Sequence, residues 1–191
     1  MSTNHTASNI ALSKILEYST SGQSMNQEIS ALLSDINGQD IFELCYLASK
    51  IRDQKKQRVV TFSPKVFIPL TRLCRDICGY CTFRQEPYNV RDLYMSPDAI
   101  LEVARHGQKL GCTEALFTLG ERPELKYPEA KQWLERHGFK STLDYLKFAC
   151  ELVLKETSLL PHANPGTMSQ REMEDLLPFN VSMGLMLEST S

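Results

Sequence analysis

The chain has 191 residues, enough for one well-buried domain, and its 42% apolar and 23% charged residues are ordinary for a globular protein. Its formal net charge of −2 gives no reason to expect nucleic acid or an anionic membrane as a partner. No apolar run approaches the ~20 residues that span a bilayer, and the N-terminus lacks the features of a signal peptide. Six cysteines without a secretory signal favour a reducing compartment, so we expect a cytoplasmic protein whose thiols bind metal.

The first 57 residues are expected to contain helices and a flexible end. Residues 1–24 are rich in Ser, Thr and Asn, which predicts a largely flexible N-terminus with a short helix near Ile10–Leu16. Residues 25–57 are predicted to form a helical segment of two helices, the first capped by Asn26. Cys45 lies on the apolar stripe of the second helix, which predicts a buried thiol.

A buried strand then leads into a group of cysteines. Val66–Thr71 is mostly β-branched and apolar, as in a strand of a parallel sheet. Soon after it come Cys74, Cys78 and Cys81, spaced C-x3-C-x2-C. These three cysteines are therefore expected on a loop past the C-terminal end of a strand, where α/β folds place their chemistry.

Three thiolates at this spacing restrict the choice of metal. Soft thiolate ligands select zinc, copper(I) or iron–sulfur clusters. A structural zinc site needs four ligands, and His106 and Cys112 are candidates to complete one, although both lie on or after a predicted helix. Clusters of the [4Fe–4S] type usually take four cysteines, so three leave one iron open to bind a substrate. The sequence favours the open cluster.

Helices and strands alternate through the rest of the chain. Ser96 is expected to cap a helix that ends at Gly111, and Ala115–Leu119 is a second buried strand, which ends at Gly120-Glu121. Further helices are predicted at Pro128–His137, after Ser141 and at Gln170–Leu177. Further strands are predicted at Leu159–Gly166 and Val181–Ser189. In the third strand, His162 and Asn164 alternate with Ala163, so both are candidates to face a barrel interior or, alternatively, to hydrogen-bond the loop.

This order of elements predicts an α/β fold with parallel strands and right-handed crossovers. Residues 58–191 are expected to form the first part of a TIM-like (βα) barrel, incomplete at about four βα units, preceded by N-terminal helices. No helix follows the last predicted strand, which would leave an exposed edge and an unfilled barrel. We therefore expect the chain to be a fragment of a longer protein.

The cysteine spacing resembles the hallmark of the radical S-adenosylmethionine (radical SAM) superfamily, C-x3-C-x-aromatic-C, with Tyr80 in the aromatic position. The resemblance implies that Cys74, Cys78 and Cys81 bind a [4Fe–4S] cluster whose open iron chelates SAM. It also implies that Tyr80 lies beside the SAM adenine, although a packing role for this aromatic residue is compatible with that. Gly120 and Glu121 stand where the family has a Gly-Gly-Glu-like motif that meets the SAM ammonium, with Leu119 in place of the first Gly. Glu188, on the fourth strand, is the candidate for the SAM ribose; a solvated loop acid is the alternative.

Longer strings are similar to the FO synthase family, specifically to its 7,8-didemethyl-8-hydroxy-5-deazariboflavin synthase module. These strings are VFIPLTRLCRDICGYCTF, CTEALFTLGERPE, STLDYLKFACELVLKETSLLPHANPG and SMGLMLESTS. The resemblance implies a radical SAM lyase in which a 5′-deoxyadenosyl radical abstracts hydrogen from a 4-hydroxybenzyl/ribitylaminouracil adduct. Ring closure with loss of ammonia then gives FO, the chromophore of a deazaflavin coenzyme. Implied partners are this small-molecule substrate, an electron donor protein, and a second radical SAM module, separate or fused.

Two other interpretations remain open at this point. One is a different radical SAM enzyme of the menaquinone or biotin type. The other is a non-catalytic metal-binding fragment, in which the cysteine loop holds a cluster or zinc but an incomplete barrel cannot enclose SAM and substrate.

Overall fold

The computed structural model describes residues 2–21 and 26–186. The chain divides into two compact units, residues 1–61 and 62–191. The division lies close to the boundary that the sequence predicts after residue 57.

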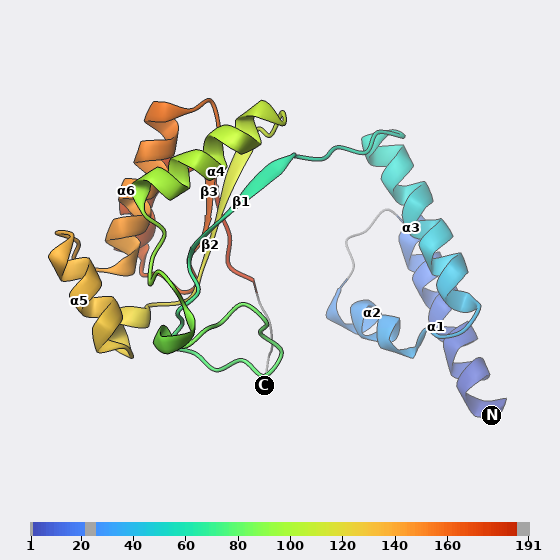
Figure 1. Cartoon of the computed structure of the whole chain (residues 1–191). Coiled ribbons are helices and arrows are strands. Elements are labelled where there is room, and N and C mark those ends of the chain that lie inside the picture. The colour runs from blue at the N-terminus through green and yellow to red at the C-terminus, as the bar shows by residue number, and fades with distance from the viewer. Residues whose placement is uncertain (1, 22–25, 187–191) are drawn as a thin grey trace. The chain divides into compact units, whose positions relative to one another are not determined.

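The N-terminal unit is helical (Figure 1). It contains α1 (Ser2–Thr20), α2 (Gln27–Ala31), a 3-10 turn η1 (Leu32–Asp35) and α3 (Asp40–Lys56). Its small core is formed by Ala11, Leu12 and Ile15 of α1 with Ile36. As expected, Asn26 caps α2, because its side-chain oxygen accepts a hydrogen bond from the Ile29 N–H at 2.9 Å.

Two features of the N-terminal unit differ from the expectations. The helix expected near Ile10–Leu16 is longer, since α1 covers Ser2–Thr20 and its apolar residues at helical spacing pack against Ile36. The Ser8 hydroxyl also donates to the Asp40 carboxylate at 2.6 Å, which ties α1 to the start of α3. Cys45 is exposed, because Leu44 takes the inward position and the next residue lies about 100° further round the helix.

The second unit is a parallel sheet with helical crossovers. Its elements are β1 (Lys65–Thr71), η2 (Pro87–Asn89), α4 (Pro97–Lys109), β2 (Glu114–Leu119), η3 (Pro123–Leu125), α5 (Pro128–Arg136), α6 (Thr142–Glu156), β3 (Leu160–Asn164), α7 (Gln170–Leu176), η4 (Leu177–Phe179) and β4 (Ser182–Met183). The strand order is β1-β2-β3-β4, and every neighbouring pair is parallel. This is the α/β, partial TIM-like arrangement of about four βα units that the sequence predicts. The fourth strand is shorter than predicted among the described residues, which end at Met186.

Local sequence explains where the helices begin. The hydroxyls of Ser96, Ser141 and Ser169 each accept the backbone N–H three residues on, at 3.1–3.4 Å, as N-caps do. Ser169 and Glu172 complete a reciprocal capping box at the start of α7. Helix α4 lies very close to β1, since a Cβ on Gly107 would come within 2.5 Å of the Val66 Cβ.

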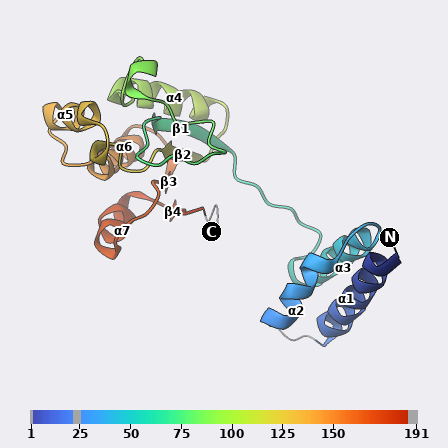
Figure 2. The same cartoon turned by 90° about the horizontal axis from the view of Figure 1, so that it is seen from below.

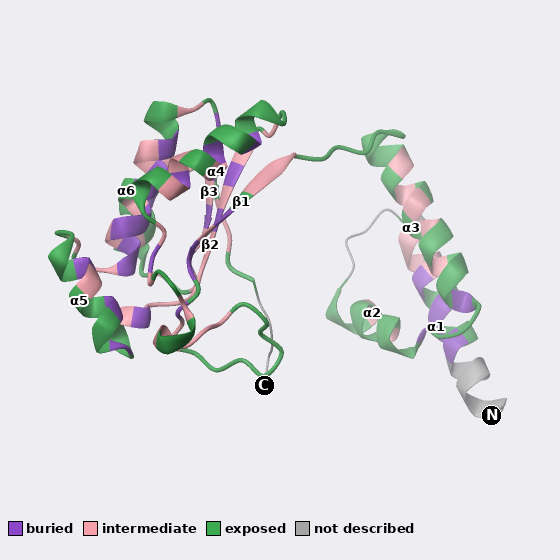
Figure 3. Cartoon of the chain, in the orientation of Figure 1, coloured by how far each residue is buried: buried purple, intermediate pink, exposed green. Residues whose placement is uncertain are grey.

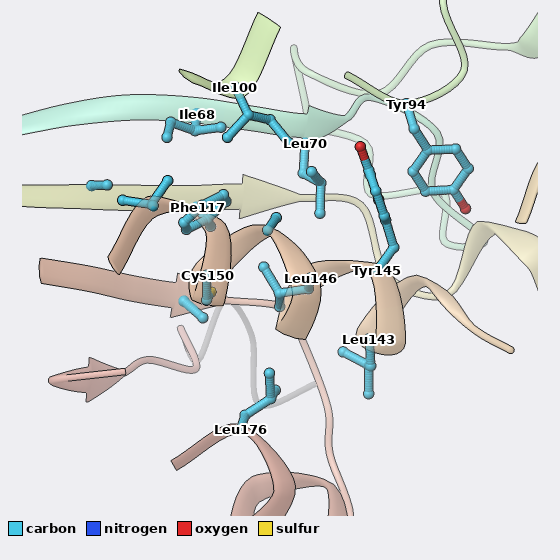
Figure 4. Packing of buried hydrophobic residues seen from close by; sticks show 14 of the residues in the cluster. Ile68, Leu70, Tyr94, Ile100, Phe117, Leu143, Tyr145, Leu146, Cys150 and Leu176 are labelled. Atoms are coloured by element: carbon cyan, nitrogen blue, oxygen red, sulfur yellow. The ribbon is translucent and has the colours of Figure 1, made fainter. Parts of the chain in front are cut away.

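The core lies between the sheet and its helices (Figures 2 and 3). Helix α4 packs on β1 and α6 packs on β3. Alternate strand residues are buried on that face, among them Ile68, Leu70 and Phe117, and they meet Ile100 of α4 and Leu146 of α6 (Figure 4). The result is one continuous core with one sheet face covered.

The opposite face of the sheet is less covered. Phe67, Leu116 and His162 are register partners on β1, β2 and β3, and Phe67 is 59% exposed. Pro69, Thr118 and Asn164 form the next row. Side chains on this face would line the interior of a closed barrel.

Candidate functional site

The cysteine loop starts at a fixed point. It leaves the C-terminal end of β1, where the buried Thr71 hydroxyl donates to the Leu93 carbonyl at 2.7 Å and accepts the Leu73 N–H at 3.1 Å. The Thr71 carbonyl accepts the Gly120 N–H from the end of β2 at 3.2 Å. The loop is therefore anchored to the second strand before its first cysteine.

Cys74 differs from the other two cysteines of the motif. It is half-buried, and its Sγ accepts the Glu121 N–H at 3.2 Å and the Asp76 N–H at 3.4 Å. Cys78 and Cys81 are exposed and are joined by a turn in which the Cys81 N–H donates to the Cys78 carbonyl at 3.0 Å. Of the three candidate ligands, Cys74 is therefore the one whose sulfur is tied to the backbone of the β2 exit.

The donor chemistry of the loop fits an iron–sulfur cluster. All three sulfurs are free thiols on one loop, two of them are exposed to an incoming metal, and the third already accepts two N–H groups. The structure does not bring the sulfurs together: among the described residues, no three His, Cys, Asp or Glu side chains converge as metal ligands would. The sequence therefore predicts the ligand set, and the loop would have to draw the two exposed thiols in toward Cys74.

The zinc alternative with His106 and Cys112 does not fit the topology. The Thr113 N–H donates to the Pro64 carbonyl at 2.9 Å, so this part of the chain lies beside the start of β1. The cysteine loop follows the other end of that strand, roughly 20 Å away at 3.3 Å per residue. Neither residue can complete a site with Cys74, Cys78 and Cys81.

Gly120 lies where backbone meets backbone. A Cβ at this position would come within 1.9 Å of the Leu73 carbonyl oxygen and 2.7 Å of the Cys74 Cβ. Only glycine fits there, since a contact with rigid backbone cannot relax as one with a flexible side chain can. Gly120 thus lets the end of β2 lie against the backbone of the cysteine loop.

The side-chain carboxylate of Glu121 is held by hydrogen bonds from two loops. Its Oε1 accepts from the Arg75 guanidinium and from the Thr167 hydroxyl, the latter at 2.5 Å, and its Oε2 accepts the Thr167 N–H at 3.2 Å. Burial alone would raise the pKa of the Glu121 carboxyl, but the Thr167 hydrogen bonds and the Arg75 charge outweigh it and hold this pKa below its usual value. These bonds occupy most of the acceptor positions that a carboxylate has.

Two predicted cofactor residues remain, Tyr80 and Glu188. Tyr80 is 61% exposed at the tip of the cysteine loop, so a role in core packing does not apply, and its place beside an adenine stays a prediction. Glu188 lies outside the described residues.

A second polar network lies on the less covered face of the sheet, near the start of the strands. The Lys65 ammonium donates to the Glu114 carboxylate at 2.5 Å and lies 3.2 Å from His162 Nδ1, which is 2.7 Å from the Ser182 hydroxyl. Hydrogen bonds from Lys65 and then Ser63 lower the pKa of Glu114 to about 2. We call Lys65, Glu114, His162 and Ser182 the lysine–histidine network.

His162 therefore bonds to neighbouring strands, and not to the loop after β3. Asn164 lies on the same face, one row further on. Its Oδ1 is buried without a hydrogen-bond partner within the described part of the chain.

Sequence reasoning missed two residues of the site. It left the role of Arg75 open, and it did not single out Thr167. Nothing local marks either of them, because their shared partner Glu121 is 46 positions away from both. In the structure, Gly166 directly before Thr167 has a positive φ of +84°, so the chain turns sharply there.

Comparisons with known proteins show which family the chain matches. Residues 68–191 match the model of the Radical SAM superfamily. The chain is 47% identical over 190 residues to FO synthase of Nocardia farcinica, covering 95% of this chain and 22% of that protein. It is 52% identical over 133 residues to 7,8-didemethyl-8-hydroxy-5-deazariboflavin synthase of Methanopyrus kandleri, covering 70% of this chain and 40% of that protein.

A solved structure shares the fold. The FeFe-hydrogenase maturase HydG from Carboxydothermus hydrogenoformans aligns with a TM-score of 0.65 at 20% identity, covering 88% of this chain and 36% of that one. The chain thus spans less than half the length of each of these relatives.

Proposed function

Since the chain belongs to the radical SAM superfamily, we propose that it contributes the cluster-binding elements of an FO-forming lyase. The proposed reaction closes the deazaflavin chromophore from a 4-hydroxybenzyl/ribitylaminouracil adduct with loss of ammonia. Support comes from the similarity to FO synthase along 95% of the chain.

The proposed division of labour follows from the site. When bound, an open [4Fe–4S] cluster supplies the electron that cleaves SAM to a 5′-deoxyadenosyl radical. Cys74, Cys78 and Cys81 would hold that cluster at the end of β1. Thr71 and Gly120 fix the base of the cysteine loop, so the chain determines where the chemistry takes place.

SAM would be bound by residues that surround this loop. We propose Tyr80 for the adenine, Gly120 and Glu121 for the methionine ammonium, and Glu188 for the ribose. Glu121 can serve an ammonium through its remaining acceptor capacity, because a charged donor beside a carboxylate makes a strong hydrogen bond.

The partners are also proposals. They are an electron donor protein and a second radical SAM module that makes the adduct, separate or fused. We propose a cytoplasmic location because all six cysteines are free thiols, as in reducing compartments. In the described part of the chain, no helix combines the length and the apolar character needed to cross a membrane.

One observation carries the proposal: three free cysteines follow β1, and the first accepts an N–H from the end of β2. This arrangement is tested by anaerobic reconstitution with iron and sulfide, followed by electron paramagnetic resonance (EPR) with and without SAM. We expect a reduced [4Fe–4S] signal that changes when SAM is added. Serine at Cys74, Cys78 or Cys81 should abolish the signal, whereas Cys45→Ser, at an exposed cysteine of the N-terminal unit, should leave it intact.

The other interpretations predict different results. A cluster indifferent to SAM would indicate a non-catalytic metal-binding fragment, and retained zinc without a cluster would contradict the assignment to this chemistry. Mass analysis of the product, with substrate and electron donor supplied, would distinguish an FO-forming lyase from a radical SAM enzyme of menaquinone or biotin type.

A further inference from the structure

The side chain of Glu121 bridges two loops that are far apart in sequence. Its carboxylate accepts from Arg75 in the cysteine loop and, at 2.5 and 3.2 Å, from the hydroxyl and N–H of Thr167, which follows β3. The Glu121 side chain is only 12% exposed. Hydrogen bonds with a charged partner are stronger than neutral ones. Solvent and salt screen such a bond less when its groups are largely buried than when they are exposed.

The backbone of the same residue contacts a cluster-ligand cysteine. The Glu121 N–H donates to Cys74 Sγ at 3.2 Å, and the Glu121 carbonyl accepts the Arg75 N–H at 2.9 Å. Any movement of Glu121 therefore changes the N–H···S geometry at Cys74. We call Arg75, Glu121 and Thr167 the Glu121 tie.

Close packing leaves Glu121 little freedom to move. A Cβ on the preceding Gly120 would overlap the Leu73 carbonyl, and a Cβ on Gly166 would lie 2.7 Å from Glu121 Oε2. A third connection is made by Arg122, whose guanidinium donates to the Thr167 carbonyl at 3.1 Å and pairs with Glu172 of α7. The exits of β1, β2 and β3 are thus joined around one residue.

We propose that Arg75 and Thr167 are positioning residues that fix Glu121, so that its N–H points at Cys74 Sγ and tunes the cluster bound there. The proposal rests on the proposed cluster site and adds two residues to it. Hydrogen bonds to the cluster sulfurs and to its ligands help set the reduction potential of iron–sulfur centres. The tie would therefore control the ease of cluster reduction as well as the shape of the loop.

The first test needs no cluster. Backbone hydrogen exchange of the anaerobic, metal-free chain is measured for wild type, Thr167→Val and Arg75→Gln. We expect the Glu121 and Arg75 amides to exchange about tenfold faster or more in both variants, since each loses a bond to a charged group. Amides of the β1–β2 ladder should be unchanged. Unchanged exchange at Glu121 would show that the tie does not hold this residue and would overturn the proposal.

The second test separates positioning from simple charge. The midpoint potential of the reconstituted cluster is measured by EPR-monitored redox titration. Thr167→Val leaves all charges in place, so a shift to lower potential in this variant reports the weakened N–H···S bond. Thr167→Ser keeps the hydroxyl and should restore the wild-type potential. Arg105→Gln, which removes an exposed arginine–glutamate pair between α4 and α6, is the matched control and should not shift it.

The outcomes distinguish this proposal from the proposed function. If a cluster assembles and responds to SAM but Thr167→Val leaves its potential unchanged, the tie has only a structural role. The tuning proposal is then wrong, while the proposed function stands. If wild type takes up no cluster, the proposed function fails and the tuning role falls with it, while the exchange experiment still shows whether the tie exists.

Discussion

The two ends of the sheet in the second unit are held by polar groups in different ways. At the start of the strands, the lysine–histidine network takes its members from strand positions that the ladder brings together: Lys65 pairs with Glu114, and His162 with Ser182. At the other end, the members of the Glu121 tie all lie in loops, and their contacts depend on close packing at Gly120 and Gly166. Register alone assembles the first network, whereas the second needs three loops to be in place at once.

This difference has a functional consequence. Residues on strands are held in place by the backbone hydrogen bonds of the sheet, so a network built from them needs few further contacts to keep its geometry. Loop residues can present thiols to a metal, but they need extra bonds to hold their geometry. The Glu121 tie supplies such bonds to the one cysteine of the motif that is half-buried.

The largest loss of stability is expected from a substitution at Gly120, at the edge of the sheet where the Glu121 tie lies. Gly120→Ala places a Cβ against the Leu73 carbonyl and should lower the free energy of unfolding of the second unit by about 2–3 kcal/mol. Gly79→Ala is the matched control in the same loop, because nothing lies within 4 Å of its Cβ position. Urea unfolding followed by fluorescence of Trp133, the single tryptophan, reports on this unit. Equal stability of the two variants would show that the close approach at Gly120 does not occur.

An intermediate loss of stability is expected from a change in the lysine–histidine network at the start of the strands, and it should depend on pH. Lys65 and Ser63 hold the pKa of Glu114 at about 2 in the folded chain, against a usual value of 4.5. The charged carboxylate therefore contributes stability that is fully present above about pH 4.5 and is lost as the pH falls through 2.

Glu114→Gln removes this contribution. It should lower the free energy of unfolding at neutral pH by about 1 kcal/mol and flatten the loss of stability between about pH 4.5 and 2. The measurement is the Trp133-monitored urea midpoint across that range, with Glu102→Gln on the exposed side of α4 as the control. A variant whose acid profile matches wild type would contradict the network.

The smallest effect is expected at an exposed ion pair between two helices. Arg105 and Glu156 form an ion pair at 3.0 Å with both side chains about half exposed, so Arg105→Gln should change stability by no more than about 0.5 kcal/mol. The urea midpoint in low and high salt checks this. A loss as large as that of Glu114→Gln would mean that burial does not distinguish the networks from ordinary surface pairs.

The sequence alone predicted the helix cap at Ser96, the helices after Ser141 and at Gln170–Leu177, the strands Val66–Thr71 and Ala115–Leu119, and the parallel α/β order. Each of these depends on residues that are close together in the chain, so local patterns contain the information. The cysteine spacing likewise identified the candidate ligands Cys74, Cys78 and Cys81, because their spacing is itself local. The wrong expectation concerned side-chain environment: Cys45 is exposed, because burial depends on which helices pack together.

Only the tertiary structure decided what Glu121 does. The family resemblance marks it as a candidate cofactor residue, and the structure adds that its carboxylate meets Arg75 and Thr167 while its N–H meets Cys74 Sγ. The tertiary structure also separated His106 and Cys112 from the cysteine loop by the length of a strand. In both cases the physical reason is the same: parallel strands bring their C-terminal ends to one edge of the sheet, so residues some 46 positions apart become partners while nearer ones are carried to the opposite edge.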